Sequence, residues 1–149
     1  MSRPGWVAPL SFAIAIAGTA VATYLTIAHY TSPKLLACSS TGVVNCERVT
    51  TSAQSEVFGV PVALMGLAWF LAMTCLCSPW AWRSATPWIR TARLAAATIG
   101  IAFVLWLVYA ELLVIRAICL WCTAAHVLAF ALFVIVALYG TAVAEAGGS

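Results

Sequence analysis

Long apolar stretches dominate the chain and alternate with shorter segments that carry its polar and charged residues. Four stretches contain almost no Asp, Glu, Lys or Arg: 9–30, 60–78, 94–114 and 120–140. Each is close to the roughly 20 helical residues that cross a bilayer core of about 30 Å, and each is apolar on all faces. The pattern therefore predicts an all-α integral membrane protein, a four-transmembrane-helix bundle formed by a single domain over residues 1–149.

The composition supports this prediction and removes several classes of protein. Hydrophobic residues make up 64% of the 149 residues and charged residues only 7%. A soluble domain carries about 25% charged residues on average, so a soluble globular domain, a secreted soluble scaffold and a disordered chain are all excluded. The net charge of +3 comes from scattered basic residues, which argues against nucleic-acid binding.

The basic residues also predict an orientation, because Lys and Arg are enriched in cytoplasmic loops. Arg83, Arg90 and Arg93 lie together in the short segment 79–93. We therefore place this segment and both termini in the cytoplasm, and the external loop 31–59 on the outer face. The first apolar stretch is too long for a signal peptide and is followed by no clear cleavage site, so we expect it to be retained.

The placement of the cysteines points to redox chemistry at one face of the membrane. The chain contains Cys38, Cys46, Cys75, Cys77, Cys119 and Cys122. The first two lie in the external loop and the last two at the outer end of the fourth predicted span, where oxidised thiols persist. The middle two lie near the inner end of the second span, and we interpret them as small apolar fillers.

Cys119-Leu120-Trp121-Cys122 is a Cys-x-x-Cys motif that opens a predicted helix. Residues three apart on a helix share a face, and their separation is close to the range that a disulfide needs. The positive end of the helix dipole lowers the pKa of a thiol at such a site. These properties favour a redox-active pair over a static disulfide. Haem attachment is excluded because Thr123, rather than histidine, follows the motif.

The spacing of Cys38 and Cys46 leaves their role open. Seven residues separate them, and Gly42 and Asn45 allow the turn that brings them together. The pair is either a structural disulfide or a shuttle between an external partner and Cys119. A four-cysteine zinc site is a less favoured third interpretation, because zinc ligands usually come as paired knuckles in soluble loops, and no metal site is predicted.

Two polar residues lie inside predicted spans, where they are costly without a partner. His126 follows Cys122 by four residues and so lies one turn along the same helix face. It either bonds a neighbouring backbone carbonyl or donates to the carbonyl oxygen of a quinone beside Cys122. Glu111 lies near the outer end of the third span, and we expect it to reach the membrane interface.

The order of these motifs resembles the vitamin K epoxide reductase family over residues 9 to 140. The resemblance rests on the loop pair, a Ser-x6-Gly-x-Pro segment and a Cys-x-x-Cys that opens the last helix. The matching residues are Cys38, Asn45, Cys46, Glu47, Arg48, Val49, Ser52, Phe58, Gly59, Val60, Pro61, Gly66, Ile118, Cys119, Leu120, Trp121 and Cys122.

The resemblance implies a four-helix membrane bundle around a quinone, capped by a short half-helix that we place at 50–57. It implies that Cys122 reduces the quinone, of the menaquinone, ubiquinone or vitamin K type. Cys38 would exchange with a thioredoxin-like partner, and Cys46 would then exchange with Cys119. The expected activity is that of a quinone-linked, disulfide-forming oxidoreductase.

The resemblance also suggests residues that hold the quinone: His126, Ser55 and Phe58. Vertebrate members use a Tyr one turn after the second catalytic cysteine and an Asn before the Phe-Gly segment, and His126 and Ser55 take those places here. Many bacterial relatives carry a fused thioredoxin-like domain. We expect the partner of this chain to be a separate thioredoxin-like (DsbA-like) protein on the outer face of a bacterial inner membrane.

Three other interpretations stay open. The first is a vitamin K epoxide reductase in the strict sense, which would use the same relay on an epoxide. The second, less favoured, is disulfide bond formation protein B, which carries its Cys-x-x-Cys in the first external loop and its wider pair in the second. The third is a non-enzymatic membrane protein with structural disulfides.

Overall fold

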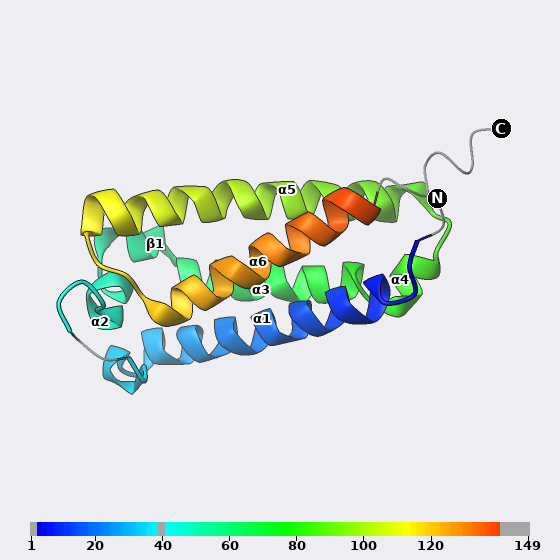
Figure 1. The fold of residues 1–149 in the computed structure, drawn as a ribbon. Helices are drawn as coiled ribbons and strands as arrows, with labels where there is room; N and C mark the ends of the chain where they lie inside the picture. The colour runs from blue at the N-terminus through cyan, green and yellow to red at the C-terminus, as the bar shows by residue number, and fades with distance from the viewer. Residues whose placement is uncertain (1–2, 39–40, 141–149) are drawn as a thin grey trace.

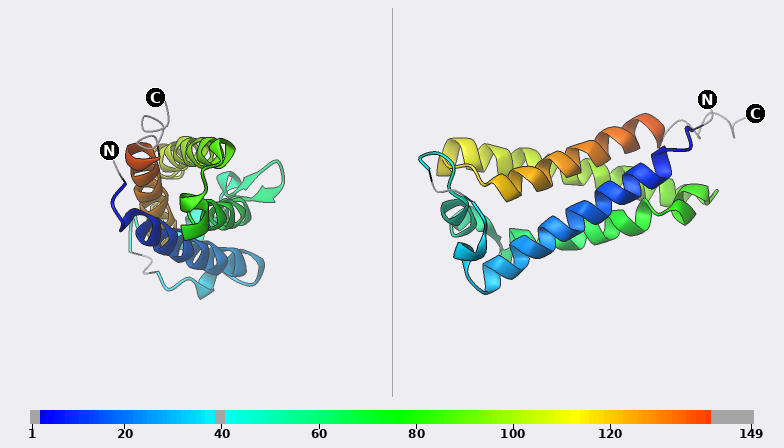
Figure 2. Two further views of the ribbon diagram at one scale, coloured as in Figure 1. Left: turned by 90° about the vertical axis from the view of Figure 1, so that its right-hand side faces the viewer. Right: turned by 60° about the horizontal axis from the view of Figure 1, so that its bottom comes forward.

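The computed structural model describes residues 3–38 and 41–140 as an elongated helical bundle. Four helices run side by side along it (Figures 1 and 2): α1 (Val7–Tyr30), α3 (Val62–Leu76), α5 (Pro87–Tyr109) and α6 (Leu120–Tyr139). The shorter elements are η1 (Pro33–Leu35), α2 (Cys46–Thr50), η2 (Ala53–Ser55), β1 (Glu56–Val57), β2 (Val60–Pro61), α4 (Pro79–Arg83) and the π-helical η3 (Ala110–Ile115). The all-α membrane class is confirmed.

Three of the described helices are long and apolar enough to cross a membrane: Val7–Tyr30, Pro87–Ile115 and Leu120–Tyr139. They correspond to the first, third and fourth predicted spans. The second predicted span, 60–78, contains the shorter helix α3 of 15 residues. At 1.5 Å per residue it covers about 22 Å, less than a bilayer core of about 30 Å. The helix is short because Val60 and Pro61 belong to strand β2 and because Cys77 already caps its end.

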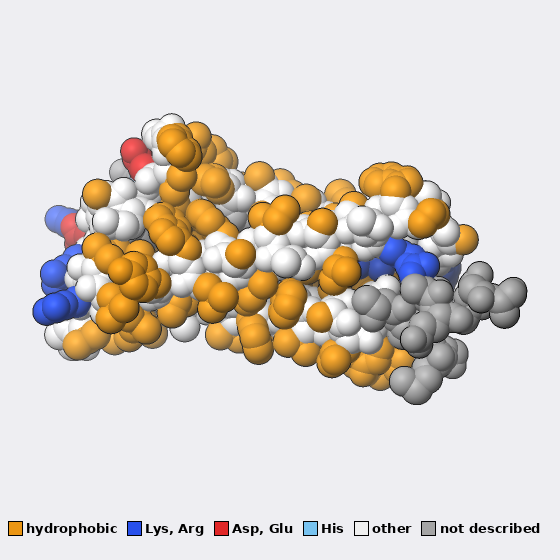
Figure 3. Space-filling model, turned by 90° about the horizontal axis from the view of Figure 1, so that it is seen from above, with side chains coloured by type: hydrophobic (Ala, Val, Ile, Leu, Met, Phe, Trp, Pro, Cys, Tyr) orange, Lys and Arg blue, Asp and Glu red, His pale blue; other side chains and the backbone are white. Residues whose placement is uncertain are grey.

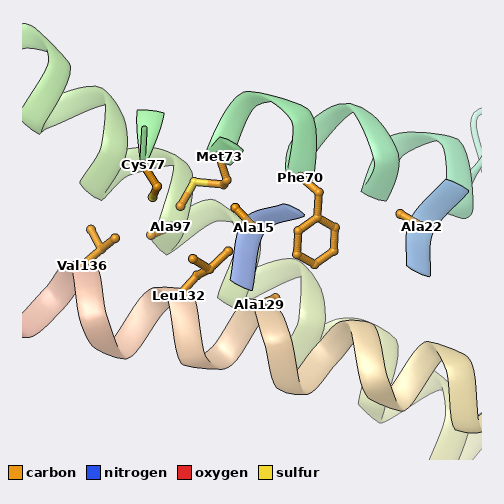
Figure 4. Close-up of a cluster of buried hydrophobic side chains, with 9 residues drawn as sticks. All are labelled: Ala15, Ala22, Phe70, Met73, Cys77, Ala97, Ala129, Leu132 and Val136. Atoms are coloured by element: carbon orange, nitrogen blue, oxygen red, sulfur yellow. The ribbon is translucent and has the colours of Figure 1, made fainter. Parts of the chain in front are cut away.

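The bundle is held together where all four long helices meet, as Figure 4 shows. The buried side chains there are Ala15, Ala22, Phe70, Met73, Cys77, Ala97, Ala129, Leu132 and Val136. Small residues let the helices approach closely, as is common in membrane bundles. A Cβ atom at Gly18 of α1 would overlap the ring of Phe70 on α3, and one at Gly100 of α5 would overlap the indole of Trp69.

The outer surface of the bundle is apolar along its length. In Figure 3 hydrophobic side chains cover the middle of the molecule, and charged side chains gather toward its two ends. Large exposed side chains lie on every long helix, including Leu10, Leu71, Leu105 and Phe130. This distribution is typical of a protein in lipid, because hydrocarbon cannot form hydrogen bonds with polar side chains.

The half-helix expected over 50–57 is not present as one element. Helix α2 begins after Asn45, whose Oδ1 accepts a hydrogen bond from the Arg48 backbone N–H at 2.9 Å, and ends at Thr50. A single 3₁₀ turn, η2, follows, and the antiparallel hairpin β1–β2 completes the segment. Phe58 and Gly59 form the two-residue turn of this hairpin. Their φ angles are 53° and 76°, and positive φ at both central residues is typical of a type I′ hairpin turn. The capping layer is therefore a helix, a turn and a hairpin.

The end of the bundle where α1 begins and α6 finishes, here called the arginine end, is held by a buried Arg93. The sequence predicts Arg93 in a connecting segment, but α5 already begins at Pro87 and Arg93 is 1% exposed. Its guanidinium donates to the carbonyls of Leu76 at 2.7 Å and Ala81 at 3.0 Å. It also stacks 3.7 Å from the ring centroid of Trp82. Arg93 therefore joins the ends of α3, α4 and α5.

Candidate redox site

The Cys-x-x-Cys motif opens α6 in the manner that the sequence predicts. Cys119 is the N-cap residue, and its Sγ accepts a hydrogen bond from the Cys122 backbone N–H at 3.2 Å. Cys119 is completely buried, and Cys122 is partly buried on the first turn of the helix. Both are free thiols. The sulfur of Cys119 thus satisfies one of the backbone donors that a helix start leaves without an internal partner.

This position changes the acidity of Cys119. The hydrogen bond from the Cys122 thiol, aided by backbone N–H groups of Cys122 and Trp121, holds the pKa of the Cys119 thiol below its ordinary value, although burial opposes this. A thiol with a lowered pKa is a better leaving group and is more often ionised near neutral pH. The lowered pKa of Cys119 therefore comes first from the other cysteine of the motif and then from the backbone N–H groups at the helix start.

The external loop pairs with the segment just before the motif. The Asn45 backbone N–H donates to the Ile118 carbonyl at 3.0 Å, and the Ile118 N–H donates to the Val43 carbonyl at 2.9 Å. Val44 and Ile118 thus form a parallel bridge. Cys46 and Cys119, which follow these segments, are both buried in one hydrophobic cluster. The backbone pairing is what brings the loop cysteines to the motif.

Cys38 and Cys46 form a disulfide with a Cα–Cα distance of 6.1 Å. The predicted turn at Gly42 is confirmed: φ at Gly42 is 61°, and the Val44 N–H donates to the Thr41 carbonyl at 3.3 Å. Unlike the buried Cys46, Cys38 is only partly buried. The disulfide therefore joins a buried cysteine in the cluster that contains Cys119 to a partly exposed cysteine at the edge of that cluster.

Two aromatic residues fix the chain next to Cys38. The Tyr24 hydroxyl donates to the Leu35 carbonyl at 2.7 Å and accepts from the Ala37 N–H at 3.0 Å. The Trp121 indole N–H donates to the Ala37 carbonyl at 3.3 Å, and its ring meets Tyr24 edge to face at 4.8 Å. Trp121 lies between the two cysteines of the motif, so this contact ties the motif to the segment that carries Cys38.

An apolar cavity of about 310 Å³ opens beside Cys122. It lies between the four long helices and is covered by α2 and η2, and its walls come mainly from Leu, Val, Ala, Met, Phe and Trp side chains. Ser55 lines it near the cover and Cys122 and His126 line it from α6. An apolar pocket with a few polar groups is the usual form of a site for an organic molecule. The residues present therefore fit the head group of a quinone.

The structure brings together most, but not all, of the residues singled out in the sequence. His126 lines the cavity. Its imidazole has no hydrogen-bond partner among the described residues, so the predicted alternative of a hydrogen bond to a neighbouring backbone carbonyl is not seen. Phe58 is fully exposed at the hairpin turn and does not line the cavity. The predicted contact of Phe58 with the quinone therefore has no support from the lining of this cavity.

Glu111 is the residue whose surroundings the sequence prediction missed. It was expected to reach the membrane interface, but it is 7% exposed and lines the same cavity as Cys122. It lies in the π-helical segment η3, and single π turns often occur at functional sites. The sequence did contain one indication that Glu111 belongs to the site. An ionisable residue within an apolar membrane span is by default a candidate for a functional role.

Cys75 and Cys77 lie at the arginine end, away from the other four cysteines. Cys77 is buried in the core of the bundle, as expected of a filler, whereas Cys75 is exposed. Among residues 3–38 and 41–140, no group of three or more His, Cys, Asp or Glu side chains is arranged to hold a metal ion.

Residues 9–137 match the sequence model of the Vitamin K epoxide reductase family. The chain belongs to this family. The match covers nearly the full length of the four long helices and includes both cysteine pairs, so the site lies within the matched residues. Membership in the vitamin K epoxide reductase family implies an oxidoreductase of the membrane whose redox chemistry involves disulfides and a quinone.

Proposed function

We propose that this chain is a membrane oxidoreductase that takes electrons from a separate thioredoxin-like protein and reduces a quinone, so that disulfides form in the partner. One observation carries the proposal: the pairing of Asn45 with Ile118 places the Cys38–Cys46 disulfide beside a Cys-x-x-Cys motif whose second thiol opens onto an apolar cavity. A structural disulfide alone needs neither a neighbouring low-pKa thiol nor such a cavity.

The electron path follows from which sulfurs are accessible. A partner dithiol attacks the partly exposed Cys38, breaks the Cys38–Cys46 bond and frees Cys46. Cys46 then attacks Cys119 in the Cys119–Cys122 disulfide, and Cys122 leaves as a thiolate. The second thiol of the partner attacks the mixed disulfide, so that the partner leaves with its own disulfide and frees Cys38. Cys38 then attacks Cys46 in the Cys46–Cys119 bond and releases Cys119, so that Cys119 and Cys122 are both reduced. The dithiol is finally reoxidised as two electrons pass from Cys122 to the quinone.

The cavity supports a flat, apolar acceptor, and its polar groups at Ser55 and His126 are suited to the carbonyl oxygens of a quinone. When bound, the quinone supplies the electron-accepting ring, and the protein supplies the dithiol and the apolar surroundings.

The proposed topology has four spans, with the cysteine pairs on the outer face of a bacterial inner membrane and both termini in the cytoplasm. Helix α3 packs along the bundle beside α1 and completes the wall of the cavity, which favours its place within the bilayer despite its length. The arginine end holds Arg83, Arg90 and Arg93 and would face the cytoplasm by the positive-inside rule.

Replacing Cys38 and Cys122 together with serine is expected to trap a disulfide between Cys46 and Cys119. The double variant lacks both sulfurs that resolve this bond, while the backbone pairing at Ile118 keeps the remaining two cysteines in one cluster. After mild oxidation with diamide and digestion with trypsin, mass spectrometry should find the peptide that ends at Arg48 linked to the peptide that begins at Ala117.

The matched control is the double variant Cys46→Ser, Cys122→Ser, which keeps Cys38 and Cys119. It should give much less cross-linked peptide, because Cys38 is held at the partly exposed side of the disulfide. Equal cross-linking in the two variants would contradict the order of exchanges, and its absence from both would contradict the relay.

His126→Ala is expected to raise the apparent KM for the quinone by about threefold to tenfold, the equivalent of one hydrogen bond of about 0.5–1.5 kcal/mol. The measurement is steady-state reduction of ubiquinone-1 and of menadione by the purified protein in detergent. Val127→Ala is the control, because Val127 is exposed on the same helix and lies outside the cavity lining. Unchanged kinetics in His126→Ala would assign the imidazole to packing.

A comparison of substrates separates the proposed activity from its nearest alternative. A vitamin K epoxide reductase in the strict sense would also reduce the 2,3-epoxide of menadione, whereas the proposed enzyme would reduce the parent quinone only. The same assay with both compounds tests this directly.

A further inference from the structure

The cavity beside Cys122 contains one carboxyl group among its described lining residues, that of Glu111. The side chain is 7% exposed and makes no ion pair in the described part of the chain. A buried carboxyl without an opposite charge is costly, so such groups within a membrane usually carry out or assist chemistry. The other titratable groups that line the cavity are His29 on α1 and Cys122 and His126 on α6.

The backbone around Glu111 brings this residue close to the segment that carries the thiols. Helix α5 changes to the π-helical turn η3 at Ala110, and the chain reverses at Arg116, whose φ is 54°. The Ala117 N–H donates to the Glu111 carbonyl at 3.1 Å, so the segment that leads to Cys119 folds back over Glu111. The Glu111 carboxyl group and the backbone of Cys119 interact electrostatically.

Glu111 is also electrostatically coupled to both thiols of the motif, because its charge acts on Cys119 and on Cys122. Helix α2 also packs against η3 and contributes Val49 and Thr50 to the cavity. Neither of these side chains can carry a proton in this pH range. The remaining charged groups of α2, Glu47 and Arg48, are exposed. Glu111 is thus the acidic group placed to exchange protons with the dithiol.

We propose, as a refinement that rests on the proposed function, that Glu111 accepts a proton from the Cys119–Cys122 dithiol and passes it to the quinone in the cavity. Oxidation of the dithiol breaks two S–H bonds, forms one S–S bond and releases two electrons and two protons. Formation of the quinol consumes the same two electrons and two protons in two new O–H bonds. Glu111 takes up one proton that is released at Cys119, transfers it to the quinone and so returns to its initial charge. The second proton passes from Cys122 to the quinone on the side of the cavity that His126 lines.

The first test measures turnover of ubiquinone-1 against pH for the wild type, Glu111→Gln and Glu47→Gln, with dithiothreitol as reductant. Glutamine keeps the size of the side chain but cannot carry the proton, so kcat is expected to fall about 100-fold, within the usual range for general acid–base catalysis. Glu47→Gln is the matched control, since it removes an exposed carboxyl next to the site and should keep the wild-type kcat. Equal thermal unfolding midpoints establish that both variants fold.

The second test needs no quinone. In a Cys122→Ser background, the rate of iodoacetamide reaction at Cys119 is followed against pH with and without Glu111→Gln. The negative charge of Glu111 raises the pKa of Cys119, so its removal should move the alkylation profile to lower pH. A nearby charge of this kind typically changes a thiol pKa by about one unit.

The outcomes separate this proposal from the proposed function. Absence of wild-type turnover would overturn the proposed function and the role of Glu111 with it. Wild-type turnover that is lost in Cys122→Ser but kept in Glu111→Gln would overturn the proton transfer alone. Loss of turnover in Glu111→Gln with an unchanged alkylation profile would assign Glu111 to packing and also overturn the proposal.

Discussion

Cys122→Ser is expected to lower quinone reduction by ~10³-fold or more, which is the scale of losses when a covalently acting residue is removed. Cys122 is the cysteine of the motif that lines the cavity, whereas Cys119 is buried behind it at the helix start. Serine preserves the shape of the site but supplies no sulfur to donate electrons. The measurement is reduction of ubiquinone-1 by the purified protein in detergent, driven by dithiothreitol and corrected for the uncatalysed rate.

Cys75→Ser is the control for this variant, because Cys75 is exposed at the arginine end and lies outside the cavity. It should retain the wild-type rate. Full activity in Cys122→Ser would remove the basis of the relay. If the wild type reduces no quinone and its cysteines keep one redox state when reductant is withdrawn, the disulfide is structural.

Arg93→Ala is expected to lower the free energy of unfolding by about 3 kcal/mol, the sum expected of two hydrogen bonds from a charged group and one cation–π contact after partial compensation. The substitution leaves the carbonyls of Leu76 and Ala81 without their donor in a buried setting and exposes a face of Trp82. Unfolding by SDS in mixed micelles, followed by circular dichroism, measures the loss.

Two further variants show which property of Arg93 matters. Arg83→Ala removes an exposed arginine from α4 and should change the free energy of unfolding by less than about 0.5 kcal/mol. Arg93→Lys keeps the charge but loses the planar group that reaches two carbonyls while stacking on Trp82, so most of the loss should remain. Stability equal to the wild type in Arg93→Ala would show that the contacts at this end are dispensable.

The class of the protein and the start of its last helix could be predicted because both depend on local properties of the chain. Hydropathy and length identify the spans at 9–30, 94–114 and 120–140, since a helix in lipid satisfies its backbone within itself. The Cys-x-x-Cys spacing and the helix start act within one turn, so the lowered pKa of Cys119 was also predictable.

The predictions that failed concern places where distant segments compete for the same residues. The segment 50–57 contains the end of α2, the turn η2 and strand β1, because residues 56–57 pair with residues 60–61 of the next strand instead of continuing a helix. Arg93 was assigned to a loop from its charge. In the folded chain its cost of burial is offset by two carbonyls and an indole that come from other elements.

The sequence alone determined that this is a helical membrane protein with a redox motif at a helix start, because periodicity, hydropathy and short spacings are properties of neighbouring residues. Only the tertiary structure decided which of those residues meet. The pairing of Asn45 with Ile118 brings Cys46 to Cys119, and the π turn places Glu111 in the cavity with Cys122. These contacts join segments far apart in the chain, and they form only when the helices pack and the connecting loops fold back over them.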